Sequence, residues 1–269
     1  MSSVKAAFLG GGNMGGALIA GIVEAGVSKP GDVTVAEIVD ERRQELADTY
    51  GVATTKEPSD ALGGADVVLI AVKPQILDKV LPPLSGKIDK SQTVVSIAAG
   101  VSTTTLEKML GDGVRLVRAM PNIPAAVRQG ATAICPGTNA VDHDMDLAEK
   151  LLGAVGRVVR IDETQMDAVT GLSGSGPGYA FSIIDALADG GVKAGLPKPL
   201  ALTLAAQTLL GAAEMFLSGD KHPAELKDMI TSPGGTTAAG LAMMDAKGIR
   251  DALISGVEAS ANRSKELGQ

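Results

Sequence analysis

The stretch Val4-Lys-Ala-Ala-Phe-Leu-Gly-Gly-Gly-Asn-Met-Gly15 decides the fold of the first half of the chain. Its mostly apolar start predicts a strand over residues 4–9, and a helix is expected over about 13–27. Gly10 to Gly15 fits G-x-G-x-x-G at this strand-to-helix turn. In that context the glycines permit a tight turn, close approach of a pyrophosphate and close helix packing. The pattern therefore predicts a dinucleotide-binding domain.

A second strand, expected over residues 33–36, ends at Glu37. An acidic residue about 20 positions beyond the glycines holds the ribose hydroxyls in this fold. A carboxylate there suits the free 2′-hydroxyl of NAD and would repel the 2′-phosphate of NADP. Arg42 and Arg43 on the next helix either offset this repulsion or form a solvated helix face. The sequence leaves NADH and NADPH both open as the cofactor.

The alternation of strands and helices continues, with strands expected over residues 65–72, 93–98 and 114–119. Their carboxyl ends meet at one edge of an open parallel sheet, where ligands bind. Lys73 at one of these ends is read either as a ligand contact or as an ordinary solvated lysine. The residues predicted to bind the cofactor are Gly10, Gly12, Asn13, Met14, Gly15, Glu37, Ala71, Val72, Lys73, Pro74, Ala98, Ala99, Gly100 and Asn122.

Two further strands are expected at residues 131–135 and 157–161, on either side of a helix over about 142–154. Beyond them only helical patterns are found. The predicted fold class is therefore α/β. An amino-terminal Rossmann-type doubly wound sheet (residues 1–162) is followed by an all-α dimerisation domain (163–269). The segment 200–217 is apolar on nearly every helical face. Such a helix must be buried, which predicts an intertwined homodimer with a large obligate interface.

One loop of the helical half has a composition suited to a small acid. A helix expected to end near Ile230 runs into Thr231-Ser-Pro-Gly-Gly235, and the next helix starts at about Thr236. The hydroxyls of Ser232, Thr236 and Thr237 then surround a helix N-terminus, which favours a carboxylate. The alternative is a well-capped helical hairpin, because Ser and Thr are ordinary caps.

Composition and charge argue against several classes of binding partner and site. The 269-residue chain has a formal charge of −7, no Trp and few other aromatics, which argues against nucleic acids and acidic membranes. The lone Cys135 excludes a disulfide framework and is expected to serve packing. Both histidines, His143 and His222, are expected to be structural, and no metal motif is present. No signal peptide or apolar run of transmembrane length is recognised, so a reducing, cytoplasmic location is expected.

The loop and its flanks resemble the signature of the pyrroline-5-carboxylate reductase family over residues 223–245. Further stretches of this resemblance are 10–15, 71–74, 98–100, 120–122, 172–177 and 185–191. The resemblance implies reduction of pyrroline-5-carboxylate to proline, the last step of proline biosynthesis, by NADPH or NADH. It also implies homodimers that assemble into a larger ring, commonly a decamer. Glu37 is a mild departure, since members that prefer NADPH often carry a small polar residue there.

The resemblance also implies roles for the loop. Substrate-binding residues are Ser232, Gly235, Thr236 and Thr237, whose hydroxyls and backbone N–H groups would hold the substrate carboxylate. Thr237 is the expected catalytic residue, with its Oγ at the ring nitrogen, and the proton would come from Thr237 or from solvent. The active site is expected in a cleft between the two domains, with the loop from the same chain or from its partner.

Two other readings stay open. A β-hydroxyacid dehydrogenase would share Gly171, Gly174 and Gly176, but Ala180 occupies the position of the acid–base lysine. A non-catalytic nucleotide-sensing module would bind cofactor without turnover. Nicotinamide absorbance followed with pyrroline-5-carboxylate, and then with 3-hydroxy acids, separates the three readings.

Overall fold

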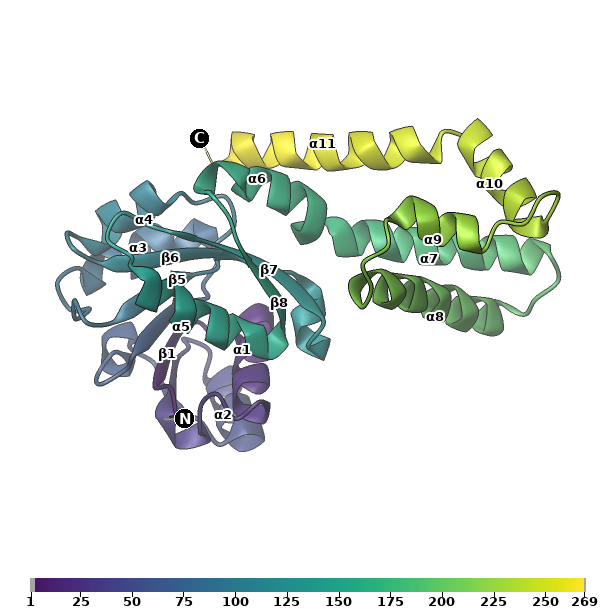
Figure 1. The fold of residues 1–269 in the computed structure, drawn as a ribbon. Coiled ribbons are helices and arrows are strands. Elements are labelled where there is room, and N and C mark those ends of the chain that lie inside the picture. The colour runs from purple at the N-terminus through teal and green to yellow at the C-terminus, as the bar shows by residue number, and fades with distance from the viewer. Residues whose placement is uncertain (1–2, 269) are drawn as a thin grey trace. The chain divides into compact units, whose positions relative to one another are not determined.

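The computed structural model describes residues 3–268, which form two compact units. The first, here called the sheet unit, contains the chain up to Ser175 and the carboxyl-terminal segment from Ala259. The second, the helical unit, is Gly176–Glu258 (Figure 1). The predicted domain boundary after residue 162 differs from this grouping of contacts and stays a prediction.

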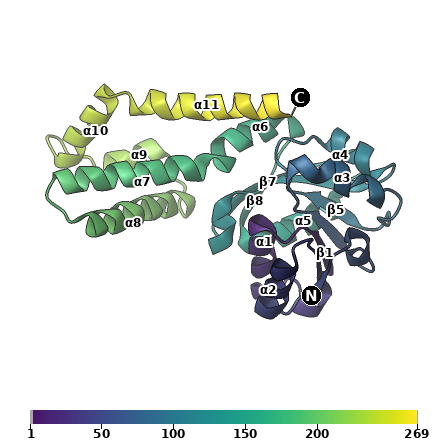
Figure 2. The same ribbon diagram turned by 180° about the vertical axis from the view of Figure 1, so that it is seen from behind.

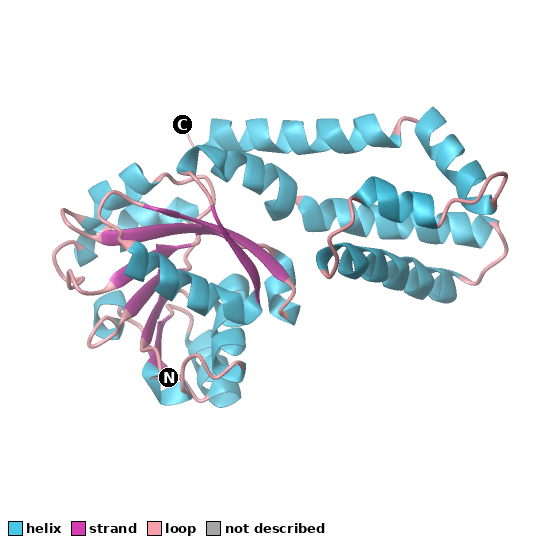
Figure 3. Ribbon diagram, viewed as in Figure 1, coloured by secondary structure: helices cyan, strands magenta, loops and turns pink. Residues whose placement is uncertain are grey.

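The sheet unit is built on an eight-stranded sheet with the order β3-β2-β1-β4-β5-β6-β7-β8 (Figure 3). All neighbouring strands are parallel except β6 and β7, which pair antiparallel. The strands are β1 (Ala6–Leu9), β2 (Val33–Ala36), β3 (Ala53–Thr55), β4 (Val67–Ile70), β5 (Thr93–Ser96), β6 (Arg115–Met120), β7 (Gly130–Pro136) and β8 (Gly156–Arg160). The order reverses direction at β1, so the carboxyl ends of β1, β2 and β4 form the switch point where dinucleotides bind.

Helices cover both faces of this sheet, as Figure 2 shows from behind. They are α1 (Asn13–Glu24), α2 (Asp40–Tyr50), α3 (Leu77–Val80), α4 (Thr103–Leu110) and α5 (Asp142–Leu152), while the short α6 (Met166–Val169) follows the last strand. Side chains of β1 alternate between two cores: Phe8 packs with α1, α2 and α5, whereas Leu9 packs with α3 and α4. This two-sided burial explains why the parallel strands are almost continuously apolar.

The helical unit has a much smaller core. Its helices are α7 (Gly176–Lys193), α8 (Lys198–Leu217), α9 (Pro223–Met229), α10 (Thr236–Ala246) and the first part of α11 (Ile249–Leu267). Its buried cluster consists of Ala188, Ala201 and Ala205 where α7 packs on α8. Large side chains of α8 stay exposed, including Leu204 (49%) and Leu210 (53%). A single chain therefore leaves most of the apolar surface of α8 uncovered.

The structure confirms the predicted fold class and most elements, with ends shifted by a few residues. The strand at residues 33–36 and the starts of α1, α5 and α10 match the prediction. The short strand β3 was not predicted, and α1 ends at Glu24, before the predicted residue 27. No uninterrupted apolar run was expected to reach transmembrane length, and Gln207 and Glu214 do interrupt α8, but this helix, with 20 residues and a mean hydropathy of 1.5, is long and apolar enough to cross a membrane. Length and composition alone give α8 this property.

Candidate active site

The glycine turn between β1 and α1 has the geometry that a dinucleotide requires. Gly10 has φ +102°, and a side chain there would approach the Ala71 carbonyl oxygen at 2.9 Å. A side chain at Gly15 would collide with the Gly10 carbonyl oxygen. At Gly12, in contrast, an added Cβ would meet no atom within 4 Å, so the missing side chain leaves free space. Gly10 and Gly15 therefore serve the backbone, and Gly12 keeps room for a ligand.

A cavity of about 520 Å³ opens at the carboxyl ends of β1, β2 and β4. Of the predicted residues, Gly10, Gly12, Glu37, Ala71, Val72 and Lys73 line it. Gly12 is the N-cap of α1, and the first N–H groups of a helix lack intrahelical partners, so a pyrophosphate is favoured there. Free space at Gly12, a helix N-terminus and a carboxylate for the ribose together fit a nicotinamide dinucleotide.

Glu37 is fixed at the rim of this cavity by the backbone. The Gly11 N–H donates to Oε2 of Glu37 (2.9 Å), and the Val39 N–H donates to Oε1 (3.1 Å). Its own N–H donates to the carbonyl oxygen of Thr55 at the end of β3 (3.0 Å). The carboxylate is thus held in place before any ligand binds.

Other cavity residues were not predicted. Ile38, Val39, Lys56 and Ile76 also line the cavity. Lys56 follows β3, so missing this strand meant missing the lysine. The signal was present in the sequence, since Gly51 ends α2 in the left-handed conformation (φ +68°) and a strand-forming Val-Ala-Thr-Thr stretch follows.

The remaining predicted cofactor residues do not line this cavity; they are Asn13, Met14, Gly15, Pro74, Ala98, Ala99, Gly100 and Asn122. The side chain of Asn122 has a structural use. Its Nδ2 donates to the carbonyl oxygen of Ser173 (3.0 Å), and its Oδ1 accepts from the Ala131 N–H (2.8 Å). Asn122 therefore ties the end of β6 to β7 and to the turn that follows α6, and its role toward the cofactor stays a prediction.

A partly buried ion pair braces the region after β5. Glu163 accepts from the N–H of Thr103 (2.7 Å), from its hydroxyl (2.6 Å) and from Arg118 (2.8 Å). Partial burial alone would raise the pKa of Glu163, but these hydrogen bonds outweigh it and bring the pKa below its ordinary value. The carboxylate thus stabilises the start of α4, shortly after the predicted contact at residues 98–100.

The lone cysteine and the histidines have the expected surroundings. Cys135 is fully buried in β7, and burial raises the pKa of its thiol to about 11, which keeps it protonated near neutral pH. His222 caps α9, with Nδ1 accepting from the Ala224 N–H (3.2 Å). Among residues 3–268, no group of three or more potential metal ligands is found.

In the helical unit, a tight turn precedes α10. Gly234 has φ +70°, and the Gly235 N–H donates to the Ser232 carbonyl oxygen (2.9 Å). A side chain at Gly235 would collide with Oγ of Ser232. Gly235 is the N-cap of α10 and supplies no side-chain cap. The structure thus brings Ser232, Gly235, Thr236 and Thr237 together at a helix N-terminus, but the Gly235 N–H is already paired within the turn.

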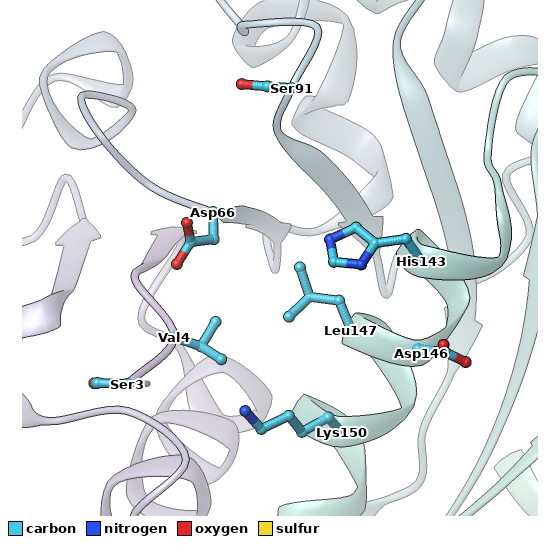
Figure 4. A pocket seen from close by; sticks show the side chains of 8 residues that line it. All are labelled: Ser3, Val4, Asp66, Ser91, His143, Asp146, Leu147 and Lys150. Atoms are coloured by element: carbon cyan, nitrogen blue, oxygen red, sulfur yellow. The ribbon is translucent and has the colours of Figure 1, made fainter. Parts of the chain in front are cut away.

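A second cavity, of about 380 Å³, lies at the opposite edge of the sheet (Figure 4). Its lining residues Val4, Asp66 and Ser91 precede β1, β4 and β5, so it faces the amino ends of these strands. Asp66 accepts from the Lys5 N–H (2.8 Å), and Asp146 pairs with Arg160 (2.5 Å). The cavity therefore lies at the wrong end of the strands for the dinucleotide site, and both of its acidic side chains already have partners.

Comparison with known families gives two matches. Residues 163–267 match the family described as pyrroline-5-carboxylate reductase dimerisation. Residues 5–100 match the family described as NADP oxidoreductase, coenzyme F420-dependent. These matches cover the helical half and the first strands of the sheet.

Individual relatives match over the whole chain. A pyrroline-5-carboxylate reductase of Methanosarcina acetivorans is 44% identical over 269 residues, covering 100% of both chains. The solved structure of a pyrroline-5-carboxylate reductase from Coxiella burnetii is 36% identical with a TM-score of 0.95, again covering 100% of both. A Plasmodium falciparum pyrroline carboxylate reductase, solved with NADP bound, is 31% identical with a TM-score of 0.88 and the same coverage.

Proposed function

The chain belongs to the pyrroline-5-carboxylate reductase family, and from this premise we propose which of its residues carry the reaction. The protein is an oxidoreductase that reduces the C=N bond of 1-pyrroline-5-carboxylate to give proline, the last step of proline biosynthesis, with NADPH or NADH. The observation that carries the site assignment is the turn Ser232–Gly235 leading into α10, with hydroxyls and unpaired helix N–H groups at one place.

The turn before α10 is the proposed binding site for the substrate carboxylate. The N–H groups of Thr236 and Thr237 open the helix and have no partner within its hydrogen-bond ladder. A carboxylate there is favoured by these donors, by the helix dipole and by the Ser232 hydroxyl. Because the Gly235 N–H closes the turn onto Ser232, the proposed part of Gly235 is to leave space for the Ser232 side chain.

Thr237 is the proposed catalytic residue. Its hydroxyl would bond the ring nitrogen of the imine, steadying the protonated form, and the proton itself comes from Thr237 or from solvent. When bound, the reduced nicotinamide supplies the hydride that is added to the imine carbon. The chain's contribution is chiefly orientation, which can be worth up to ~7–11 kcal/mol in well-aligned reactions.

The test is Thr237→Ala. Loss of one hydrogen bond in the transition state predicts a fall in kcat of about 10- to 100-fold, or ~1–3 kcal/mol, with cofactor affinity unchanged. Thr231→Ala is the matched control, since the Thr231 hydroxyl already donates to the Lys227 carbonyl oxygen (2.7 Å) and should not affect turnover. Unchanged kinetics in Thr237→Ala would remove this residue from the mechanism.

Hydride transfer requires that the loop and the nicotinamide meet during the reaction, within one chain or across a dimer. Mixing a Gly12→Val protein with a Thr237→Ala protein decides between these arrangements. Recovery of activity on subunit exchange supports a site shared between chains. No recovery supports a site within one chain.

A homodimer is the proposed basic assembly, with further association into a ring, commonly a decamer in this family. The support is the uncovered apolar surface of α8 within the segment that matches a dimerisation family. On this proposal α8 contacts a second chain rather than a membrane. The proposed location is the cytoplasm, in keeping with a single buried, unpaired cysteine. Light scattering of the purified protein without detergent tests the assembly.

The alternative of a β-hydroxyacid dehydrogenase keeps only weak support, because Ala180 lies on α7 where an acid–base lysine would be needed. Turnover with 3-hydroxy acids and not with pyrroline-5-carboxylate would favour it. Cofactor binding without turnover of either substrate would favour a sensing module.

A further inference from the structure

The feature that carries a further inference is the end of β2, where Glu37 meets the dinucleotide cavity. In this fold the residue at that place contacts the ribose 2′-position, the only part that distinguishes NADH from NADPH. We propose that this enzyme is selective for NADH and that Glu37 is the residue that rejects the 2′-phosphate. This inference rests on the proposed function, since it concerns the cofactor of that reaction.

Glu37 cannot easily turn away from a phosphate. Its two carboxylate oxygens each accept a backbone N–H, from Gly11 at 2.9 Å and from Val39 at 3.1 Å. Gly11 belongs to the glycine turn, so the acid is tied directly to the site of the pyrophosphate. Rotating Glu37 outward would leave both N–H groups without this acceptor, which costs free energy.

The nearby arginines are engaged by the protein itself. Arg42 donates from Nε to the Gly11 carbonyl oxygen (2.7 Å) and pairs with Glu45 (2.7 Å). Arg43 donates to the Glu37 carbonyl oxygen (2.6 Å) and pairs with Asp40 (2.5 Å). NADP sites in this fold accommodate the phosphate with an arginine. Here both guanidinium groups hold the backbone around Glu37 instead.

The residues after Glu37 also lack phosphate ligands. Ile38 and Val39 line the cavity and are 73% and 49% exposed. They offer an apolar surface suited to the adenine ring and no hydroxyl or amide side chain. Glu57, which lines the cavity, adds a further negative charge there.

Lys56 is a cation that could attract the 2′-phosphate of NADPH and so oppose the effect of Glu37. It lines the same cavity, is exposed, and lies beside Glu57. Lys73 lines the cavity from the end of β4. A flexible, solvated lysine gives little affinity compared with a fixed bidentate arginine. Repulsion from the fixed Glu37 therefore dominates, and a like charge at close range predicts discrimination on the order of 100-fold.

The test measures the dissociation constants of NADH and NADPH without substrate, by nicotinamide fluorescence, on the wild-type protein and three variants. The wild type should bind NADH about 100-fold more tightly than NADPH. Glu37→Ser should move this ratio at least about tenfold toward NADPH, and Glu37→Gln should move it in the same direction while keeping the shape of the side chain. Lys56→Gln should leave NADH preferred.

Equal affinity or tighter NADPH binding in the wild type overturns the inference, as does an unchanged ratio in both Glu37 variants. Glu37→Gln supplies the result should Glu37→Ser fold poorly, which thermal unfolding shows. Turnover with pyrroline-5-carboxylate is measured separately. Preferential NADH binding without turnover would contradict the proposed function and leave this inference standing, whereas equal turnover and binding with both cofactors would do the reverse.

Discussion

The two units of the molecule use apolar residues in opposite ways. In the sheet unit, strand residues such as Phe8 and Leu69 are fully buried, because helices cover both faces of the sheet. In the helical unit, the buried cluster contains three alanines, while Leu204 and Leu210 are about half exposed. The contrast teaches that the sheet unit contains its own core, whereas the helical unit is completed by association.

The largest expected effect comes from placing charges on the exposed apolar surface of α8, which tests whether the helical unit needs association to bury it. Replacing Leu204 and Leu210 together by Glu should weaken dimerisation by at least ~3–5 kcal/mol, because charges would be buried without partners. Sedimentation velocity over a range of protein concentrations measures the effect. The sheet unit should keep its cofactor affinity if it folds independently.

The matched control for this variant is Lys87→Glu, which changes the net charge by the same two units at an exposed position of the sheet unit. It should leave the assembly unchanged. A Leu204→Glu, Leu210→Glu protein that sediments like the wild type at every concentration would show that α8 does not form the interface.

A second change tests whether the sheet unit alone binds the cofactor. Gly12→Val places a side chain in the free space of the cavity, so cofactor affinity should fall at least tenfold, about 1.4 kcal/mol or more. Thermal stability should stay unchanged, because no neighbour lies within 4 Å of the added Cβ. Titration of cofactor fluorescence and thermal unfolding check the two statements.

Gly31→Val serves as its control, since Gly31 also has open space within 4 Å but lies outside the dinucleotide cavity. The cofactor affinity of this variant should equal that of the wild type. Equal cofactor binding by the Gly12→Val protein and the wild type would mean that the pyrophosphate lies elsewhere.

The smallest expected effect concerns Glu163. Glu163→Gln should lower the free energy of unfolding by about 1–2 kcal/mol near neutral pH, since a partly exposed carboxylate loses charge-assisted hydrogen bonds. The folded-state pKa is lowered, so the stabilisation is present above the unfolded value near 4.5 and is lost as the pH falls through the folded pKa. Urea unfolding of both proteins over a pH series measures this difference.

The gap between wild type and Glu163→Gln should therefore close in acid. Glu149→Gln is the surface control, because Glu149 pairs with Arg160 at an exposed position and should show little gap at any pH. A Glu163→Gln gap of the same size at pH 7 and at pH 3 would show that the ionised carboxylate is not what stabilises the start of α4.

Much of the fold could be predicted from local pattern. Apolar runs bounded by turn residues identified β1, β2, β4 and β5, since strands buried on both faces read as continuous hydrophobic segments. The three-residue β3 escaped because so short a strand has no period to detect. Because β3 was not predicted, neither was Lys56, which follows it and lines the same cavity as the predicted ribose contact Glu37.

The site residues also divide into those that local sequence pattern revealed and those that it did not. Gly10, Gly12 and Gly15 were identified from spacing, because Gly10 and Gly15 answer local backbone needs and Gly12 leaves room for the ligand in the same turn. The hydrogen bonds of Arg42, Arg43 and Asn122 could not be read from sequence, since each reaches backbone groups from another part of the chain or from a turn whose geometry is not visible there.

The sequence by itself determined the order of strands and helices, the family, the glycine turn and the loop before α10. These are local properties, written in residue spacing and backbone freedom. Only the tertiary structure decided that Glu37 is fixed by two N–H groups, that the arginines beside it are engaged, and that α8 is uncovered in one chain. These facts depend on how the folded chain brings groups together, as when Gly11 meets both Glu37 and Arg42. Charge or apolar pattern alone does not specify which partner each side chain meets.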